Sequence, residues 1–472
     1  MVAALSTDNE AVKVKENTLL KINLNGSLNE RSQDNPFEDL QLDLLGMDSE
    51  AQLGLNDLRS GLQAAAQDPN IQGILLDQGA FASGYGSLEE LSDYLKEFKA
   101  SGKKVYSYGE YYTQKGAYLG ALSDSTILHP GGIYDLRGVG VSLTYYKEFF
   151  DKIGVEPLVV RGSGNDFKSA VEPYLYSEMS DENELQLRVL TDQFWSFLKG
   201  AFTERGLSES LVDSAAANWV GMDAESMQKL GFVDALGYRE NVMDHFDEKF
   251  ELLNFFDYTS TIKQPSAKDR IAVIYANGSI GNGSGDESSI GTKNIIKALR
   301  KAEDNDRVKA IVLRVNSPGG SALTSDMIHH TIGELEKPVV VSQGNYAASG
   351  GYYISCNADA IFTNSTTVTG SIGIFMSLFT AEELLENTLG LHVEEVKTHP
   401  LANFPSLHKQ PSEHEYAVLQ KMIDRGYADF TGKVAEGRNM PMDDLLPLCG
   451  GRVWTGKDAN EFGLTDLEGN LS

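Results

Sequence analysis

The chain has 472 residues and a strongly acidic composition, with 40 Lys and Arg against 68 Asp and Glu and a formal net charge of -28. Such a surface repels phosphate backbones and anionic membranes, which argues against nucleic-acid binding. The length exceeds what one hydrophobic core usually organises, and the 41% hydrophobic content is that of a folded globular protein, so we expect two domains of roughly 200 residues each.

Residues 1–17 do not resemble part of a domain. They begin with the short apolar stretch MVAAL and continue with polar residues, which is typical of a linker remnant after a missing membrane anchor. An ordinary disordered N-terminus accounts for the same pattern. No run in the sequence approaches the roughly 20 apolar residues that cross a bilayer, so we expect the chain as written to be soluble.

From residue 18 onward, strand segments alternate with helical stretches. The first half contains the strand segments TLLKINLNG (18–26), IQGILLDQG (71–79) and KKVYSYG (103–109), then a helical stretch at 180–199 and a tail at 219–237. The continuous hydrophobicity of the second of these segments suits a strand that is covered on both faces. The alternation predicts the α/β class, with stacked strand-helix-strand units and mostly parallel sheets.

The same order of elements returns in the second half. Its segments are IAVIYANGS (271–279), VKAIVLRVN (308–316) and KPVVVSQG (337–344), then a helical stretch at 412–425 and a tail at 453–469. Within that helical stretch, Ser412 and Glu415 have the spacing of a capping box. We therefore predict an internal duplication, with an N-terminal repeat at 18–247, a connector at 248–268 and a C-terminal repeat at 269–472.

The two repeats differ at positions that carry chemistry. Ser349 lies in the AASGG segment of the second repeat, and 235 positions earlier the first repeat has Gln114. The FKSAVEP segment of the first repeat presents Lys168, whereas the matching PLANFPS segment has Phe404 or a neighbour. Each copy lacks what the other keeps, and this complementarity predicts one Ser-Lys site assembled from both.

Two glycine-containing segments are candidates for an oxyanion hole. Ser349 is expected where a β-rich run turns into a helix, near unpaired backbone N–H groups. The NSPGG segment at 316–320 ends an apolar strand, and its paired glycines free the backbone to aim another N–H into a cleft. Taken singly, each motif has an ordinary explanation, since AASGG also packs helices tightly and SPGG also forms a simple Pro-Gly turn.

A serine nucleophile needs a base, and the eight histidines lie outside the segments that carry the other site elements. A lysine serves this role only when it is neutral, which requires burial to depress its pKa. Lys168 follows Phe167 and precedes a small apolar segment, surroundings that favour burial, although a surface ion pair is the common alternative. Ser371 in TGSIG (369–373) supplies a hydroxyl able to orient the base, or one that satisfies its own backbone.

The combination of RVNSPGGSA, AASGGYYIS, TGSIGIF and FKSAVEPY resembles the signal peptide peptidase A (protease IV) family in its long, duplicated form. The resemblance extends over nearly the whole chain and implies two tandem repeats of the ClpP/crotonase-like fold. It places the nucleophile at Ser349, the general base at Lys168 and the serine that hydrogen-bonds this lysine at Ser371. By the same resemblance, the backbone N–H groups of Gly320 and Gly350 form the oxyanion hole.

The resemblance also implies an activity and a location. It implies a serine endopeptidase that degrades cleaved signal peptides and other unfolded hydrophobic peptides, with no metal or organic cofactor. It further implies a homotetramer held at the bacterial inner membrane by an N-terminal helix absent from this chain, with the present region facing the periplasm. Whether the serine and lysine meet within one protomer or across an interface stays open.

Two other function classes stay open as well. An acyl-CoA enzyme of the crotonase class also uses a glycine-built oxyanion hole, but it predicts CoA binding, and this acidic chain has no evident basic phosphate site. A catalytically silent scaffold predicts that a serine-directed probe does not label the protein. The two cysteines, Cys356 and Cys449, show no metal-ligand spacing, and we expect buried thiols rather than a disulfide framework.

Overall fold

The computed structural model describes residues 12–32, 53–246, 249–262 and 267–471, which fold into two compact units. Unit 1 contains the described residues up to 139 together with 194–267, and unit 2 contains residues 140–193 together with 268–471. The segment 140–193, expected with the first repeat, therefore packs within unit 2. Compact units and sequence repeats divide the chain differently, and the repeat boundaries stay a prediction.

The described strands of unit 1 form one parallel sheet in the order β6-β4-β3-β2-β1-β7. Their bounds are β1 Thr18–Gly26, β2 Ile71–Phe81, β3 Lys104–Tyr112, β4 Ser125–Tyr134, β6 Ala235–Leu236 and β7 Glu251–Asn254. Along β1, Leu19 packs into the cluster on one face of the sheet, while Leu20 and Ile22 pack into the cluster on the other. Burial of both faces explains the continuous apolar run Ile74–Leu76 in β2.

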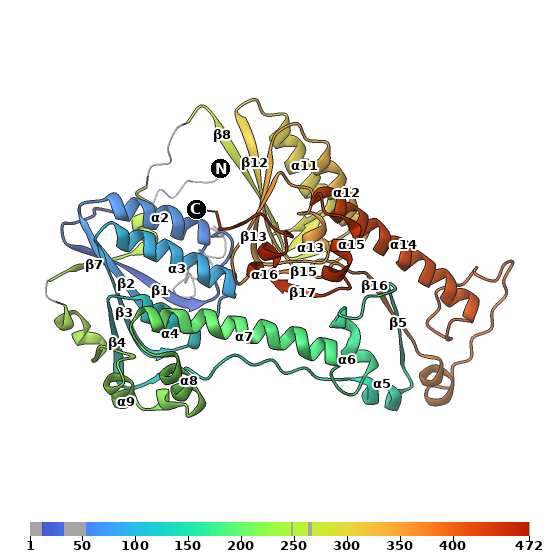
Figure 1. The fold of residues 1–472 in the computed structure, drawn as a ribbon, viewed down its shortest axis with the longest axis horizontal. Coiled ribbons are helices and arrows are strands. Elements are labelled where there is room, and N and C mark those ends of the chain that lie inside the picture. Colours follow the sequence, from blue (N-terminus) through green and yellow to red (C-terminus); the bar gives the residue numbers. More distant parts are fainter. Residues whose placement is uncertain (1–11, 33–52, 247–248, 263–266, 472) are drawn as a thin grey trace, which may run out of the picture. The chain divides into compact units, whose positions relative to one another are not determined.

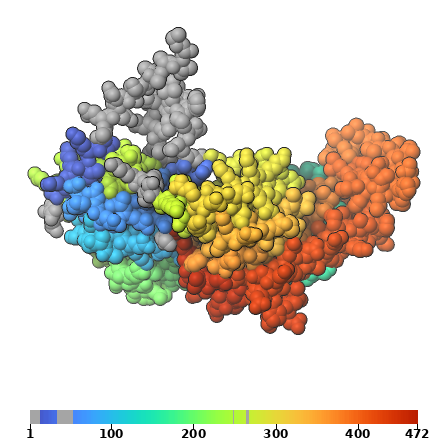
Figure 2. Space-filling model, turned by 90° about the horizontal axis from the view of Figure 1, so that it is seen from above, coloured from blue at the N-terminus to red at the C-terminus, as the bar shows by residue number. Residues whose placement is uncertain are grey.

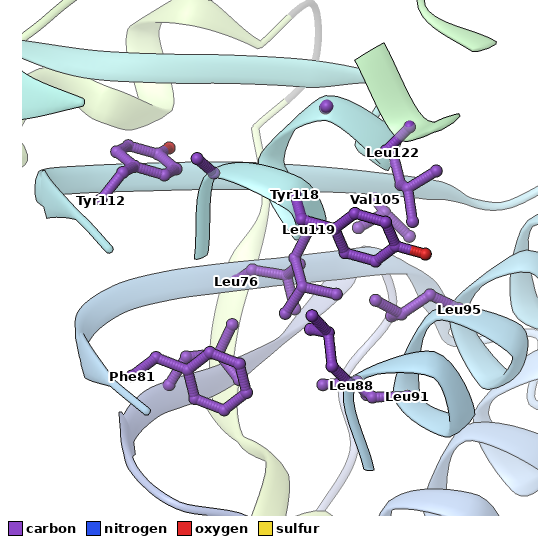
Figure 3. Packing of buried hydrophobic residues seen from close by; sticks show 14 of the residues in the cluster. Leu76, Phe81, Leu88, Leu91, Leu95, Val105, Tyr112, Tyr118, Leu119 and Leu122 are labelled. Atoms are coloured by element: carbon purple, nitrogen blue, oxygen red, sulfur yellow. The ribbon is translucent and has the colours of Figure 1, made fainter. Parts of the chain in front are cut away.

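The main core of unit 1 lies between this sheet and the helices that cover one of its faces. The helices of unit 1 are α2 Leu55–Gln67, α3 Tyr85–Ala100, α4 Gln114–Leu122, the end of α7 (Asp181–Glu204), α8 Glu209–Ala217, α9 Ala224–Lys229 and α10 Phe255–Thr259. Figure 3 shows Leu76 of β2 among Leu88 and Leu91 of α3 and Leu119 of α4, all fully buried. These contacts hold the helices on the sheet by removing apolar surface from water.

Unit 2 has a seven-stranded sheet whose main path runs β17-β15-β13-β12-β8, with β14 beside β13 and β18 beside β14. All of these pairings are parallel except that of β15 with β17. The strands are β8 Arg270–Asn277, β12 Val308–Ser317, β13 Val339–Ala348, β14 Ala360–Thr363, β15 Val368–Gly370, β17 Val453–Thr455 and β18 Leu467–Glu468. The carboxyl ends of β12, β13 and β15 therefore lie at one edge of the sheet.

Two smaller sheets accompany the main one. Strand β9 (Ser279–Gly281) pairs with β11 (Ser289–Gly291), which also pairs with β10 (Gly285–Asp286). Strand β5 (Glu156–Arg161) pairs antiparallel with β16 (Phe375–Thr380). The second pairing joins the segment 140–193 to the C-terminal part of the chain, and it explains why this segment belongs to unit 2.

Helices cover unit 2 in two groups. Helices α11 and α12, which lie side by side in Figure 1 and are yellow to orange in Figure 2, pack on the main sheet through Leu299 and Ile328. Helices α13, α14, α15 and α16 enclose a second cluster around Tyr352, Phe430 and Leu445. The α-helices of unit 2 are α5 Lys147–Ile153, α6 Glu172–Leu175, the first part of α7, α11 Thr292–Glu303, α12 Ala322–Gly333, α13 Gly350–Tyr353, α14 Glu413–Gly437, α15 Met442–Leu445 and α16 Gly456–Glu461.

The order of elements confirms the predicted α/β class with two tandem, mostly parallel repeats. The run β1-α2-β2-α3-β3-α4-β4 recurs as β8-α11-β12-α12-β13-α13-β14, with the small sheet inserted after β8. The capping box is also confirmed, since the Ser412 side chain accepts from the Glu415 N–H and the Glu415 carboxylate accepts from the Ser412 N–H. Both cysteines are free and buried.

The expected connector and the expected N-terminal linker are each described only in part. The expected connector at 248–268 contains β7, which pairs with β1, and α10, which buries Phe255 and Tyr258 in the core of unit 1. Its described part is thus integrated into a unit.

Residues 1–11 of the expected linker lie outside the described residues. In the part of the chain that the structure does describe, no helix has both the length and the apolar character needed to cross a membrane.

Gln114 has a structural role in unit 1. It begins α4, the helix that follows β3 as α13 follows β13 in unit 2. Its Oε1 accepts from the backbone N–H groups of Arg137 and Gly138 at 3.0 and 2.9 Å, and its Nε2 donates to the Gly138 carbonyl at 3.0 Å. The Gln114 side chain, at the position where the second repeat has Ser349, therefore holds the loop after β4 in place through hydrogen bonds.

We expect Gln114→Ala to destabilise unit 1 by about 1–3 kcal/mol, because three hydrogen bonds are lost and their backbone partners turn to water. Urea unfolding followed by circular dichroism measures the change. Gln72→Ala is the control, because the Gln72 amide makes one exposed hydrogen bond to the Pro69 carbonyl. Equal stability of the two variants would contradict a loop-tying role for Gln114.

Candidate active site

Ser349 lies where strand β13 ends and helix α13 begins, as the sequence predicts. Its backbone has φ 55° and ψ -118°, a conformation that residues with a side chain rarely adopt. Its N–H donates to the Gly370 carbonyl at 2.8 Å, next to the parallel pairing of Ala348 with Gly370. A sharp, strained strand-to-helix turn of this kind is the geometry that exposes a nucleophilic hydroxyl at the end of a sheet.

The glycine pair after β12 lies directly against this turn. A Cβ atom on Gly319 would lie 2.8 Å from the Ser349 Cβ and 2.7 Å from the Gly350 nitrogen, and one on Gly350 would lie 3.3 Å from the Gly320 nitrogen. Gly319 and Gly320 also have φ of +101° and +148°, which glycine adopts without strain. Only glycines allow the two backbones to approach this closely.

Strand β9 holds the glycine pair from the other side. The Ile280 N–H donates to the Gly319 carbonyl at 2.8 Å, and the Ile280 carbonyl accepts from the Ser321 N–H at 2.8 Å. These two bonds satisfy the backbone on either side of Gly320. Among the described residues, the N–H groups of Gly320 and Gly350 have no acceptor, so both are available to a ligand oxygen.

Lys168 reaches this site with its amine almost fully removed from water. The residue is 4% exposed, and its Nζ lies 3.1 Å from Ser349 Oγ. The same Nζ lies 2.8 Å from Ser371 Oγ and 2.9 Å from the Ser371 carbonyl oxygen. Burial lowers the pKa of the amine from its ordinary 10.5 to about 7, because a charged ammonium loses its hydration there. Near neutral pH, this lysine is therefore able to carry a lone pair.

Ser371 is held by the loop before β17. Its φ is 50°, its N–H donates to the Arg452 carbonyl at 2.7 Å, and its hydroxyl donates to the Gly451 carbonyl at 3.2 Å. The hydroxyl hydrogen is thus directed away from Lys168, which leaves Ser371 Oγ to accept from the amine. A backbone and side chain fixed in this way orient the lysine rather than follow it.

The loop that carries Lys168 is fixed through its backbone. The Lys168 N–H donates to the Asn165 carbonyl at 3.2 Å, and the 3-10 helix Ser169–Val171 follows directly. From α7, the Gln186 amide donates to the Phe167 carbonyl and to Ser169 Oγ at 3.2 and 2.6 Å. The lysine therefore projects from a braced loop within unit 2, which also contains Ser349 and Ser371.

The structure brings the five predicted site residues together in one unit of one chain. Ser349, Lys168 and Ser371 share direct side-chain contacts, and Gly320 and Gly350 adjoin through their backbones. The sequence interpretation missed the loop of Gly451 and Arg452, whose carbonyls hold Ser371. The CGGR segment at 449–452 carries a glycine pair like the NSPGG and AASGG segments, but no other signal in the sequence links it to Lys168.

Comparisons with known proteins match both halves of the chain. The sequence model described as Peptidase family S49 matches residues 97–253 and 333–472. A second model, described as Clp protease, matches residues 264–367, which include β12, β13 and Ser349. Together with the observed sheets, these matches confirm the expected tandem fold of the ClpP type.

Three known proteins that are similar over most of this chain are proteases by name. Protease 4 of Haemophilus influenzae is 32% identical over 481 residues, covering 96% of this chain and 77% of that protein. Protease 4 of Salmonella typhi is 34% identical over 441 residues, covering 88% of this chain and 70% of that protein. Serine protease SPPA, chloroplastic, of Arabidopsis thaliana is 32% identical over 440 residues, covering 89% of this chain and 64% of that protein.

The buried amine predicts a pH-dependent stability difference between the protein and its Lys168→Met variant. An unfolded lysine keeps its proton up to an ordinary pKa, whereas the folded amine loses it near pH 7, so folding is penalised most at low pH. The quantity to compare at each pH is the free energy of unfolding of the two proteins. The value for Lys168→Met minus the value for the unchanged protein should fall by about 4 kcal/mol from about pH 6.5 to pH 10. Urea unfolding at several pH values measures it, and a pH-independent difference would refute the lowered pKa.

Proposed function

The chain belongs to peptidase family S49 and is a protease, and on that premise we propose that it is a serine endopeptidase with Ser349 as nucleophile and Lys168 as general base. The observation that carries the proposal is the 3.1 Å contact between Lys168 Nζ and Ser349 Oγ at a buried amine. Such a base needs no metal and no organic cofactor.

The contacts of the amine assign each of its hydrogens. A neutral amine has two hydrogens and one lone pair, and Ser371 offers two acceptors, its carbonyl oxygen and its hydroxyl oxygen. When the two hydrogens go to Ser371, the lone pair is left for the remaining neighbour, the Ser349 hydroxyl. Lys168 then accepts the Ser349 proton as the Ser349 oxygen attacks a peptide carbonyl carbon.

The attack forms a tetrahedral intermediate with a negatively charged oxygen. The free N–H groups of Gly320 and Gly350 donate to this oxygen, and they are already oriented because their backbones are held by β9 and by the Ser349 turn. Collapse of the intermediate breaks the carbon-nitrogen bond, and Lys168 gives its proton to the leaving amine. An acyl ester on Ser349 remains.

A water molecule then completes the turnover. Lys168, neutral again, takes a proton from water while the water oxygen attacks the ester carbon, and the same two N–H groups stabilise the second oxyanion. The intermediate releases the carboxylic acid product, and the proton on Lys168 returns to the Ser349 oxygen. One lysine thus serves as base in both halves of the reaction, and atoms and charges balance at the end.

We propose cleaved signal peptides and other unfolded hydrophobic peptides in the bacterial cell envelope as the substrates. The resemblance of the site segments to the signal peptide peptidase A family supports this class. The absence of side chains on Gly319, Gly320 and Gly350 supports it too, because an extended peptide backbone is able to approach the nucleophile closely. Assembly as a homotetramer and attachment to the inner membrane, facing the periplasm, are part of the same proposal.

The first test is intact-mass analysis after incubation with a serine-directed fluorophosphonate. We expect one adduct on the unchanged protein, none on Ser349→Ala, and only slow residual labelling of Lys168→Ala, because the hydroxyl is poorly reactive without its base. Lys433→Ala is the control, since this lysine of unit 2 pairs with Asp326 at 2.8 Å and makes no contact with Ser349. An adduct on folded Ser349→Ala would overturn the nucleophile, and a missing adduct on the unchanged protein would favour a scaffold.

The second test is the pH dependence of kcat/KM with an unstructured hydrophobic peptide. Because only neutral Lys168 accepts a proton, kcat/KM should fall about tenfold for each pH unit below 7 and level off above it. The rise in fluorescence on cleavage of a fluorescence-quenched peptide measures the profile. Circular dichroism at each pH is the control for folding. A profile that rises only toward pH 10 would mean that the base keeps an ordinary pKa.

A further inference from the structure

The turn at 450–452 joins the two segments that form the base. The Phe167 N–H donates to the Gly450 carbonyl at 3.0 Å, next to Lys168 in the chain. The Gly451 carbonyl accepts from the Ser371 hydroxyl at 3.2 Å, and the Arg452 carbonyl accepts from the Ser371 N–H at 2.7 Å. Three successive carbonyls of one turn therefore bind the lysine loop and the serine that orients the lysine.

Gly451 also forms the surface on which the lysine side chain lies. A Cβ atom at this position would lie 2.6 Å from Lys168 Cβ, 2.7 Å from its Cδ and 2.8 Å from its Cα. Real Cβ atoms do not make contacts this short, so any side chain here displaces the lysine or the turn. With φ of +81°, the position also favours glycine for its backbone alone.

Side chains from three elements fix the turn itself. The Tyr427 hydroxyl of α14 accepts from the Gly450 N–H at 3.2 Å. The Arg452 guanidinium lies 5.0 Å from the centre of the Phe167 ring and 4.0 Å from that of Trp454 in β17. Gln186 of α7 accepts from the Val453 N–H at 3.3 Å. Because both ends are braced, the turn is able to impose a position on the lysine.

We propose that the Gly450–Arg452 turn is the positioning element of the general base, with Gly451 setting where the Lys168 amine stands relative to Ser349. The inference rests on the proposed function for its catalytic consequence, but the position of the amine is a property of the fold. None of the three residues touches substrate in this scheme. They act on the reaction through Lys168 and Ser371.

Gly451→Ala tests the proposal against Gly390→Ala, a change at φ of +67° with no atom near the added methyl group. Both variants carry a comparable backbone penalty, but only the first pushes on the lysine. We expect Gly451→Ala to lower the rate of fluorophosphonate labelling at pH 7.5 by about 100-fold, and Gly390→Ala by less than about threefold. Equal rates in the two variants would overturn the proposal.

A double-mutant cycle shows whether Gly451 acts through the lysine. In a Lys168→Ala background, Gly451→Ala should lower the residual labelling rate by less than about threefold, because the group it positions is gone. The same large loss in both backgrounds would mean that the glycine acts on the nucleophile or the oxyanion hole instead. Tyr427→Phe, which removes only the bond to Gly450, should show the same dependence on Lys168 with a smaller loss of about three- to tenfold.

A readout that is independent of catalysis separates this proposal from the proposed function. Competitive acetylation across pH, followed by peptide mass spectrometry, measures the pKa of the Lys168 amine in each folded variant. We expect a clear rise in Gly451→Ala or Tyr427→Phe and no change in Gly390→Ala, since a displaced amine regains water. An unchanged pKa overturns the positioning role even if the enzyme proves to be a lysine-dependent protease. Undiminished labelling of Lys168→Ala would instead overturn only the proposed function.

Discussion

The removal of one lysine amine from water is the constraint on which the rest of the site depends. Holding Lys168 at a pKa of about 7 costs on the order of 4–5 kcal/mol at neutral pH relative to an exposed lysine. A lysine side chain that was not held in place would avoid this cost by turning its ammonium group toward solvent. The surroundings prevent that, because the side chain lies against Gly451 and its amine is held by both oxygens of Ser371. The favourable folding free energy of the packed units as a whole offsets the cost of burying this amine.

The parallel sheet explains why the loops of the candidate site meet. Strands β13, β12 and β15 run in the same direction, with β13 between the other two, so the loops after their carboxyl ends emerge at one edge. These loops carry Gly319 and Gly320, Ser349 and Ser371. Ser349 and Ser371 both adopt positive φ without being glycine, and such strain persists only where the surrounding structure imposes it. Regular pairing of the strands on either side supplies that support.

Both units contain a mainly parallel sheet with covering helices, but the candidate site residues lie in unit 2. Unit 1 keeps the parallel sheet, its covering helices and a helix that starts at the position matching Ser349, but Gln114 there bonds to backbone. Unit 2 contains Ser349, and it also contains the segment 140–193 that carries Lys168. The pairing of β5 with β16 fastens that segment to the C-terminal part of the chain. Under the predicted repeat boundaries, the copy that has Gln114 in place of the serine contributes Lys168 to the proposed site.

Local sequence accounts for much of this. The apolar strands, the capping box at Ser412 and the strand-to-helix turn at Ser349 follow from neighbouring residues, so they were predictable from spacing and composition. The sequence alone also predicts the pair Ser349 and Lys168, because the other repeat has Gln114 opposite the serine and Phe404 or a neighbour opposite the lysine. Residue type and order suffice for such inferences because strands, turns and caps depend mainly on contacts within a few positions.

By itself, then, the sequence determined the α/β repeats and singled out the candidate site residues that the structure brings together. Only the tertiary structure decided that residues 140–193 pack in unit 2, that Gly451 lies against Lys168, and that the amine loses its water. These features join positions hundreds of residues apart, and no pattern along the chain encodes their distance. A pKa lowered by burial is the clearest case, because burial is a property of everything packed around a group and not of the group's own neighbours in sequence.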